Sequence, residues 1–108
     1  MNSKTQARYE ARVKIIKALA HPTRLFIVDE LSRSGKHCVW ELTKMVGVDM
    51  STVSRHLAIL KGAGIIGDEK QGAQVYYGIR IGCVPSFFDC VESVMKCNAR
   101  DQRKLLAN

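Results

Sequence analysis

The stretch between Gly47 and Gly64 constrains the fold of this chain more than any other. It reads GVDMSTVSRHLAILKGAG, and Val53, Leu57 and Leu60 recur in it at helical spacing. Such spacing puts these apolar side chains on one face of a helix, whose first turn Asp49 or Ser51 can cap through a side-chain oxygen. A short helix over residues 40–46 precedes the stretch and ends at Gly47. Two helices joined by a tight glycine-containing turn predict a helix-turn-helix.

The pattern before this stretch predicts two more helices. Residues 4–20 carry apolar residues at helical spacing among lysines and arginines, which is typical of an amphipathic helix. A second helix begins at Pro22, a residue suited to a first helical turn, and stops near Gly35. Its expected buried side chains are Leu25, Val28 and Leu31.

The pattern after Gly64 changes to a period of two. Ile65-Ile66 and the segment 75–79 flank the polar residues GDEKQGAQ, which predicts two strands around a turn. A last helix is expected from about Pro85 towards Leu106. The sequence therefore predicts one domain over residues 1–108, mainly α with a β-hairpin, in the order α-α-α-α-β-β-α. This order is typical of a winged helix-turn-helix.

The charge of the chain favours a polyanionic partner. Its 108 residues carry 17 Lys and Arg against 10 Asp and Glu, a formal net charge of +7. Such an excess favours nucleic acid first and an acidic membrane surface second. No hydrophobic run reaches the length of a membrane span and the first residues are charged throughout, so we expect a cytoplasmic protein with no membrane partner and with reduced cysteines. No nucleophile and base are visibly paired, which argues against an enzyme.

The polar side of the predicted helix after Gly47 is suited to contact double-stranded DNA. Short hydroxyl side chains allow a helix to sit deep in the major groove, where an arginine can bond to guanine in a bidentate manner. The free N–H groups at the helix start favour phosphate. An ordinary surface helix would show the same polar and apolar sides. The turn, the hairpin and the charge together favour DNA binding.

Three cysteines stand seven residues apart near the end of the chain, at positions 83, 90 and 97. Together with Phe87 and Val94 they form a 4-3-4-3 stripe, the pattern of a helix that packs on a partner helix. Seven residues rise about 10.5 Å along a helix. Sulfurs that share one ion lie under about 4 Å apart, so one straight helix cannot bring these thiols together. An antiparallel twofold pair centred near Cys90 would place Cys83 level with Cys97 of the partner chain. Packing alone remains the alternative, because a reduced cysteine behaves as a small hydrophobic residue.

The segments HPTRLFIVDEL, STVSRHLAILKGAGII and VYYGI resemble the ArsR/SmtB family of bacterial winged-helix repressors. The resemblance implies a homodimer that represses an operon and leaves its operator when an inducer binds. It assigns residues 1–20 and 84–106 to dimerisation, the helix from Ser51 to Lys61 to DNA recognition, and Lys70 to Gln74 to the tip of the wing. The predicted DNA-contacting residues are Ser51, Thr52, Ser54, Arg55, His56, Lys70 and Gln74.

The same resemblance points to the inducer. One recurrent family site lies on the last helix, and alignment from VYY puts Cys83 and Cys97 on two of its ligand positions. Ile81 and Val94, which cannot ligate, occupy the other two. A second family site on the third helix keeps only Cys38, because Trp40 replaces its partner cysteine. We therefore predict that Cys83, Cys90 and Cys97 bind a soft ion, with trivalent arsenic favoured and cadmium also suited, and that no organic cofactor is needed.

Two other hypotheses remain open for the cysteines. The chain could be a thiol-redox or persulfide-sensing repressor that acts through the same residues, although family members of that type usually pair the last helix with a second-helix cysteine and Asp29 stands at that position. It could also be a repressor with no inducer at these thiols.

The histidines invite separate interpretations. His21, before a proline at a helix start, is expected to cap and pack. His56 is either an operator contact or a surface histidine, and His37 is expected in a solvated loop.

Overall fold

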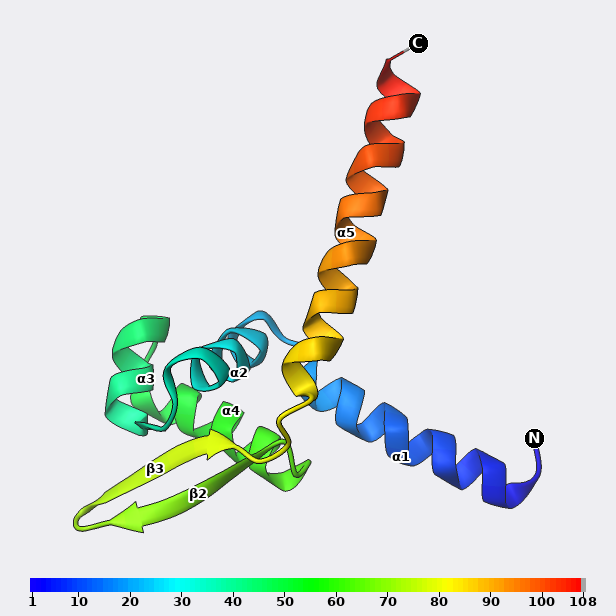
Figure 1. Cartoon of the computed structure of the whole chain (residues 1–108). Helices are drawn as coiled ribbons and strands as arrows, with labels where there is room; N and C mark the ends of the chain where they lie inside the picture. The colour runs from blue at the N-terminus through cyan, green and yellow to red at the C-terminus, as the bar shows by residue number, and fades with distance from the viewer. Residues whose placement is uncertain (108) are drawn as a thin grey trace.

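The computed structural model describes residues 1–107 and has five helices and three strands (Figure 1). In chain order these are α1 (Ser3–Leu19), α2 (Pro22–Ser34), β1 (His37–Cys38), α3 (Val39–Val46), α4 (Met50–Gly62), β2 (Ile66–Gln71), β3 (Gln74–Ile79) and α5 (Val84–Leu106). The predicted winged helix-turn-helix is confirmed: α3 and α4 form the helix-turn-helix, and β2 and β3 form the wing.

The helix ends follow the expected local chemistry. Pro22 lies in the first turn of α2, and the Nδ1 atom of His21 accepts the backbone N–H of Thr23 at 3.0 Å, so His21 caps α2 as predicted. Gly35 and Gly47 follow α2 and α3 with φ angles of 83° and 82°. A left-handed backbone is cheap only for glycine, so each residue can stop its helix without strain.

The sheet has one more strand than the sequence predicted. Its order is β1-β3-β2 and both pairings are antiparallel; in β1, His37 pairs with Tyr77 and Cys38 with Tyr76. A strand of two residues has no periodicity to detect, because only the neighbouring strand defines it. The wing is also longer than expected, since Gln71 pairs with Gln74 and leaves a turn of Gly72 and Ala73 alone. The polar residues before this turn form strand β2 with most side chains in solvent.

The core lies between α2, α3, α4 and the base of the wing. Its fully buried side chains are Ile27, Val28, Leu42, Val53, Leu57, Leu60 and Ile66. The inward face predicted for α4 is thus confirmed. The burial predicted for Leu25 is wrong: this side chain is 39% exposed, and Ile27 is buried in α2 instead. Leu25 lies on the side of α2 that faces α5, where the single chain leaves a groove.

Helices α1 and α5 project from this core as two arms (Figure 1). Only Ala18 and Leu19 of α1 are buried and no residue of α5 is, although Val84 and Phe88 pack against the core. The apolar side chains that the arms expose are Tyr9, Val13, Ile15, Ile16, Phe87, Val91, Val94, Met95, Leu105 and Leu106. The single chain therefore buries only the end of the apolar face predicted for residues 4–20, at Ala18 and Leu19. Within residues 1–107, no helix combines the length and the apolar character that crossing a bilayer requires.

Candidate nucleic-acid interface and thiol row

The start of α4 is organised around the carboxylate of Asp49. This residue is the N-cap, and it accepts the Thr52 backbone N–H at 3.0 Å, the Thr52 hydroxyl at 2.7 Å and the Ser51 hydroxyl. These bonds, of which the one from Ser51 has the largest effect, lower the pKa of Asp49 far below its usual range. Asp49 therefore stays ionised beside the helix start. The Ser51 or Thr52 hydroxyl could donate to a phosphate only after giving up its hydrogen bond to Asp49.

Ser54 and Arg55 lie on the solvent side of α4. Both are exposed, and the Arg55 guanidinium approaches Thr52 only loosely, at 3.5 Å between Nη2 and Oγ1. A long side chain with five donors and no tight partner can reach outward to a base edge or a phosphate.

His56 differs from the other residues predicted to contact DNA on this helix. Its side chain is partly buried against α2, where Nδ1 lies 3.1 Å from Nη1 of Arg24 and its ring centroid is 4.4 Å from that of His21. Burial, followed by the positive charges of His21, Arg24 and Arg55, lowers the pKa of His56. The ring is thus engaged with α2 in the middle of α4.

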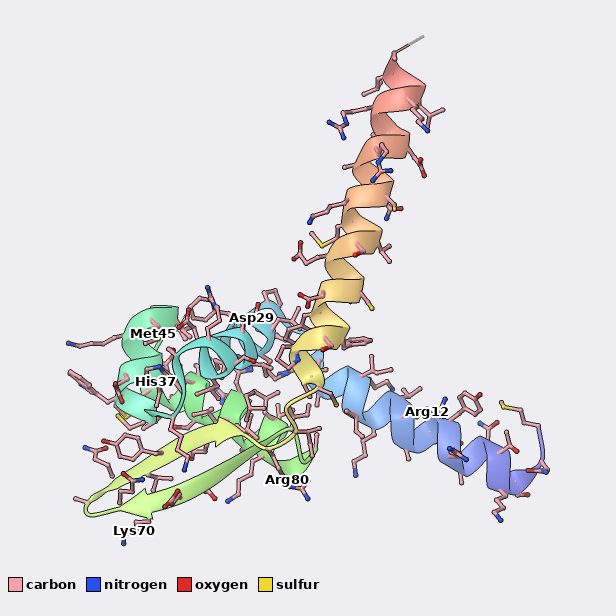
Figure 2. The ribbon with its side chains drawn as sticks, in the orientation of Figure 1. Arg12, Asp29, His37, Met45, Lys70 and Arg80 are labelled. Atoms are coloured by element: carbon pink, nitrogen blue, oxygen red, sulfur yellow. The ribbon has the colours of Figure 1, made fainter. Side chains whose placement is uncertain are left out.

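The wing presents Lys70 close to its tip, as the sequence predicted for this segment (Figure 2). Gln74 is exposed beside the turn, where it pairs with Gln71. Ion pairs hold its base. Lys61 lies 2.8 Å from Asp68, and this carboxylate raises the pKa of Lys61. Lys36 lies 2.6 Å from Glu69 and lowers the pKa of Glu69. Both pairs are exposed, so they orient the wing more than they stabilise the fold.

The three cysteines of the C-terminal segment are exposed along α5. Cys83 is the N-cap of the helix, just outside its first turn as expected, while Cys90 and Cys97 lie within it. The protomer does not use their face for packing, because α5 contacts the core through Val84 and Phe88 instead. At about 100° per residue the cysteine row points roughly 130° away from the row of Phe88, Val91 and Met95. The face of α5 that carries the three cysteines is therefore not packed against the core of its own chain.

No three metal-ligating side chains of residues 1–107 come together in one chain. This agrees with the helical rise between the cysteines. The fourth cysteine, Cys38, is buried at 5% exposure, and its backbone N–H donates to Glu41 at 3.1 Å. Cys38 is part of the junction between β1 and α3, away from the row on α5.

A groove of about 420 Å³ lies where the two arms meet the core. Its walls are mostly apolar, and two carboxylates, Asp29 of α2 and Glu92 of α5, also line it. Its apolar lining residues are Ile16, Leu19, Ala20, Leu25, Phe87, Phe88, Val91 and Met95. The sequence patterns did not indicate this groove, because it combines residues from three helices.

The prediction of a solvated loop for His37 is wrong. This residue lies in β1 and its side chain is only 12% exposed, with Nε2 2.8 Å from the Ser34 hydroxyl and Nδ1 3.3 Å from a Glu41 oxygen. The order serine, histidine, carboxylate resembles a catalytic triad. However, the Ser34 hydroxyl also donates to the Glu30 carbonyl at 2.8 Å, which ties it to its own helix. These contacts fasten the end of α2 to β1 and α3.

A helix-turn-helix with an outward polar helix and a flanking wing defines a DNA-binding winged-helix protein. Comparison with known proteins names the family. Residues 21–67 match the model described as "Bacterial regulatory protein, arsR family". The HTH-type transcriptional regulator YgaV of Escherichia coli is 32% identical over 82% of this chain and 90% of its own length.

Two further relatives agree. The arsenical resistance operon repressor of Bacillus subtilis is 42% identical over 67% of this chain and 66% of its own. The homodimeric winged helix-turn-helix DNA-binding domain of Mb0332 from Mycobacterium bovis superposes with a TM-score of 0.77 at 28% identity, over 89% of this chain and 88% of that one. The chain belongs to the ArsR/SmtB family of transcriptional regulators, and the resemblance found in its sequence is confirmed. These relatives are regulators rather than enzymes, as the sequence predicted.

Proposed function

We propose that this protein is a homodimeric repressor that leaves its operator when a soft metalloid or metal, arsenite foremost, binds thiolates of Cys83, Cys90 and Cys97. The observation that carries the proposal is the row of three exposed thiols on α5, on a side of the helix that its own domain does not cover. An arsenical resistance repressor among the relatives supports arsenic as the first ion to test.

Dimerisation is supported by the arms. Together α1 and α5 expose ten large apolar side chains, from Tyr9 to Leu106. Exposed apolar surface gathered on two elements favours a protein partner. The M. bovis domain with the same fold is homodimeric. In the dimer we propose, the terminal helices, residues 1–20 and 84–106, cover one another.

The donor set fits a soft ion and requires two chains. Thiolates select soft ions such as trivalent arsenic or cadmium over hard ones. Successive cysteines are about 10.5 Å apart along α5, so ligands for one ion must come from both protomers. In an antiparallel pair centred near Cys90, Cys83 of one protomer lies level with Cys97 of its partner.

Release of the operator follows from the position of this row. The last helix sets how far apart the two copies of α4 are held, and half-sites one helical turn apart tolerate little change in that distance. An ion that draws thiolates of both protomers together would change the distance between the two copies of α4. The required coupling between inducer and operator is typically about 1–3 kcal/mol.

Operator contact is proposed for the outward side of α4 and the wing tip. Arg55 would read a base edge, with Ser51, Thr52 and Ser54 against phosphates or bases and with Lys70 and Gln74 beside the flanking groove. The structure turns His56 towards α2, where its Nδ1 lies 3.1 Å from Nη1 of Arg24.

The decisive experiment titrates the reduced full-length protein, bound to a fluorescent operator duplex, with arsenite, cadmium, zinc and a persulfide donor. We expect release at the lowest concentrations of arsenite or cadmium and little effect of zinc. Release by zinc alone would contradict a thiol site, and release by none of the four would leave the cysteines as packing residues.

The exposure of the thiols also supports a second candidate, a redox or persulfide sensor. With a persulfide donor as the oxidant, two thiols would form a disulfide between Cys90 and its symmetry mate, or between Cys83 and Cys97 of the partner chain, while the donor is reduced to a thiol and hydrogen sulfide. In the titration above, this candidate predicts release by the persulfide donor and a covalent dimer in a non-reducing gel.

Operator binding is expected to depend strongly on salt and to require two half-sites roughly 34 Å apart. The physical reason is the release of counterions from each phosphate that a lysine or arginine neutralises. Anisotropy titrations from 50 to 200 mM salt measure the slope. A flat salt response would contradict binding through phosphate contacts.

Neutralising Lys4 and Arg8 on α1 is expected to change operator affinity very little at moderate salt. Helix α1 carries five lysines and arginines against one glutamate, but these side chains extend along an arm that leads away from α4 (Figure 1). The double variant Lys4→Gln/Arg8→Gln tests this in the same assay. A large loss of affinity would show that α1 contacts the operator.

A further inference from the structure

A polar junction joins the first arm to the predicted recognition helix. Arg24 of α2 donates from Nε to the carbonyl of Ala18, in the last turn of α1, at 2.7 Å. Its Nη1 lies 3.1 Å from Nδ1 of His56 on α4. One partly buried guanidinium thus bonds to the base of α1 and to α4 at the same time.

The protonation state of His56 follows from its partner. A guanidinium can only donate hydrogen bonds, so Nδ1 of His56 must accept and the ring must be neutral, with its proton on Nε2. His21 lies beside this ring, with its centroid 4.4 Å from that of His56, and its Nδ1 accepts the backbone N–H of Thr23.

The groups around His56 disfavour a second proton. The charged and titratable groups that face it are His21 and Arg24 of α2 and Arg55 of its own helix, and none of the three is an acid. Protonation would convert the acceptor Nδ1 into a donor and place two cations 3.1 Å apart. The bond between α2 and α4 would then be lost.

We propose that Arg24 is a positioning residue for operator binding: through neutral His56 it holds the recognition helix relative to α1, and protonation of His56 releases that hold. Acid should therefore weaken operator binding. A histidine that contacted phosphate directly would do the opposite, since its protonation adds a positive charge beside DNA. The proposal rests on the DNA-binding part of the proposed function and does not involve the thiol row.

Folding stability should follow the same direction. The pKa of His56 in the folded protein is below its ordinary value of 6.5, so the unfolded chain binds more protons. The contribution of His56 to stability is therefore complete above about pH 6.5 and is lost as the pH falls towards the folded pKa. This effect can be measured without DNA.

The test measures operator affinity of the full-length dimer by anisotropy from pH 7.5 to 5.5 at constant ionic strength. For the parent protein we expect affinity to fall on acidification, by at most about a hundredfold per pH unit, the limit for one proton in each of the two protomers. The variant His56→Gln, whose amide oxygen can accept from Arg24 without titrating, should lose this pH dependence. The matched control His37→Gln removes a histidine outside the junction and should keep it.

A second readout needs no DNA. Proton NMR of the histidine rings should show His56 titrating below pH 6.5 in the parent protein and closer to 6.5 in Arg24→Gln, which removes the facing charge. Affinity that rises or stays flat on acidification, or an unchanged His56 titration in Arg24→Gln, would overturn the proposal. Absence of operator binding at every pH would instead refute the proposed function.

Discussion

The variants Cys90→Ser and Cys97→Ser are expected to bind the operator like the parent protein and to remain bound when arsenite is added. Serine keeps the size of the side chain but cannot provide a thiolate, so the soft ion loses a ligand in each protomer. In the parent protein, a coupling of about 1–3 kcal/mol means that arsenite lowers operator affinity about 5- to 150-fold, and the variants should lose this effect. Anisotropy of a labelled operator during an arsenite titration measures it.

Two further cysteine variants serve as comparisons. Cys83→Ser should behave like the first two, because Cys83 is exposed at the N-cap of α5 on the same row. Cys38→Ala should still release, since Cys38 is buried beside α3, and alanine places no hydroxyl in the core. If the Cys90 and Cys97 variants leave the operator at the same arsenite concentrations as the parent protein, the three cysteines only pack in the dimer. The arsenite site would then have to be sought at Cys38.

The variant Arg55→Ala is expected to lower operator affinity by about 1–3 kcal/mol, the usual worth of a bidentate contact to a base. The guanidinium is exposed on the outer side of α4 and has no tight partner among residues 1–107. Its removal should therefore cost little folding stability. Competition between the operator and duplexes with single base changes shows whether sequence preference at one position is lost as well.

The control for this variant is Arg33→Ala. Arg33 is exposed on α2 and pairs with Glu30 at 2.8 Å, so its removal subtracts the same charge away from α4. Equal losses in both variants would indicate a general electrostatic effect. An Arg55→Ala protein with unchanged affinity and preference would remove Arg55 from the reading surface.

The sequence by itself determined the elements whose cause is local. Proline at the start of α2, glycines after α2 and α3, and an aspartate before α4 act on backbone groups within a few residues of themselves, so the helix boundaries followed from spacing. The inward face of α4 followed from periodicity in the same way. The seven-residue interval of the cysteines also showed that one helix cannot gather them around one ion.

The tertiary structure alone decided which neighbours each face meets. Strand β1 exists only because β3 lies beside it, and Leu25 is half exposed because α5 leaves a groove there. Periodicity places His56 on α4 but cannot show that Arg24, 32 residues earlier in the chain, lies 3.1 Å from its ring. Such contacts depend on how helices distant in sequence cross, and the short-range energies that define a helix carry no information about that crossing.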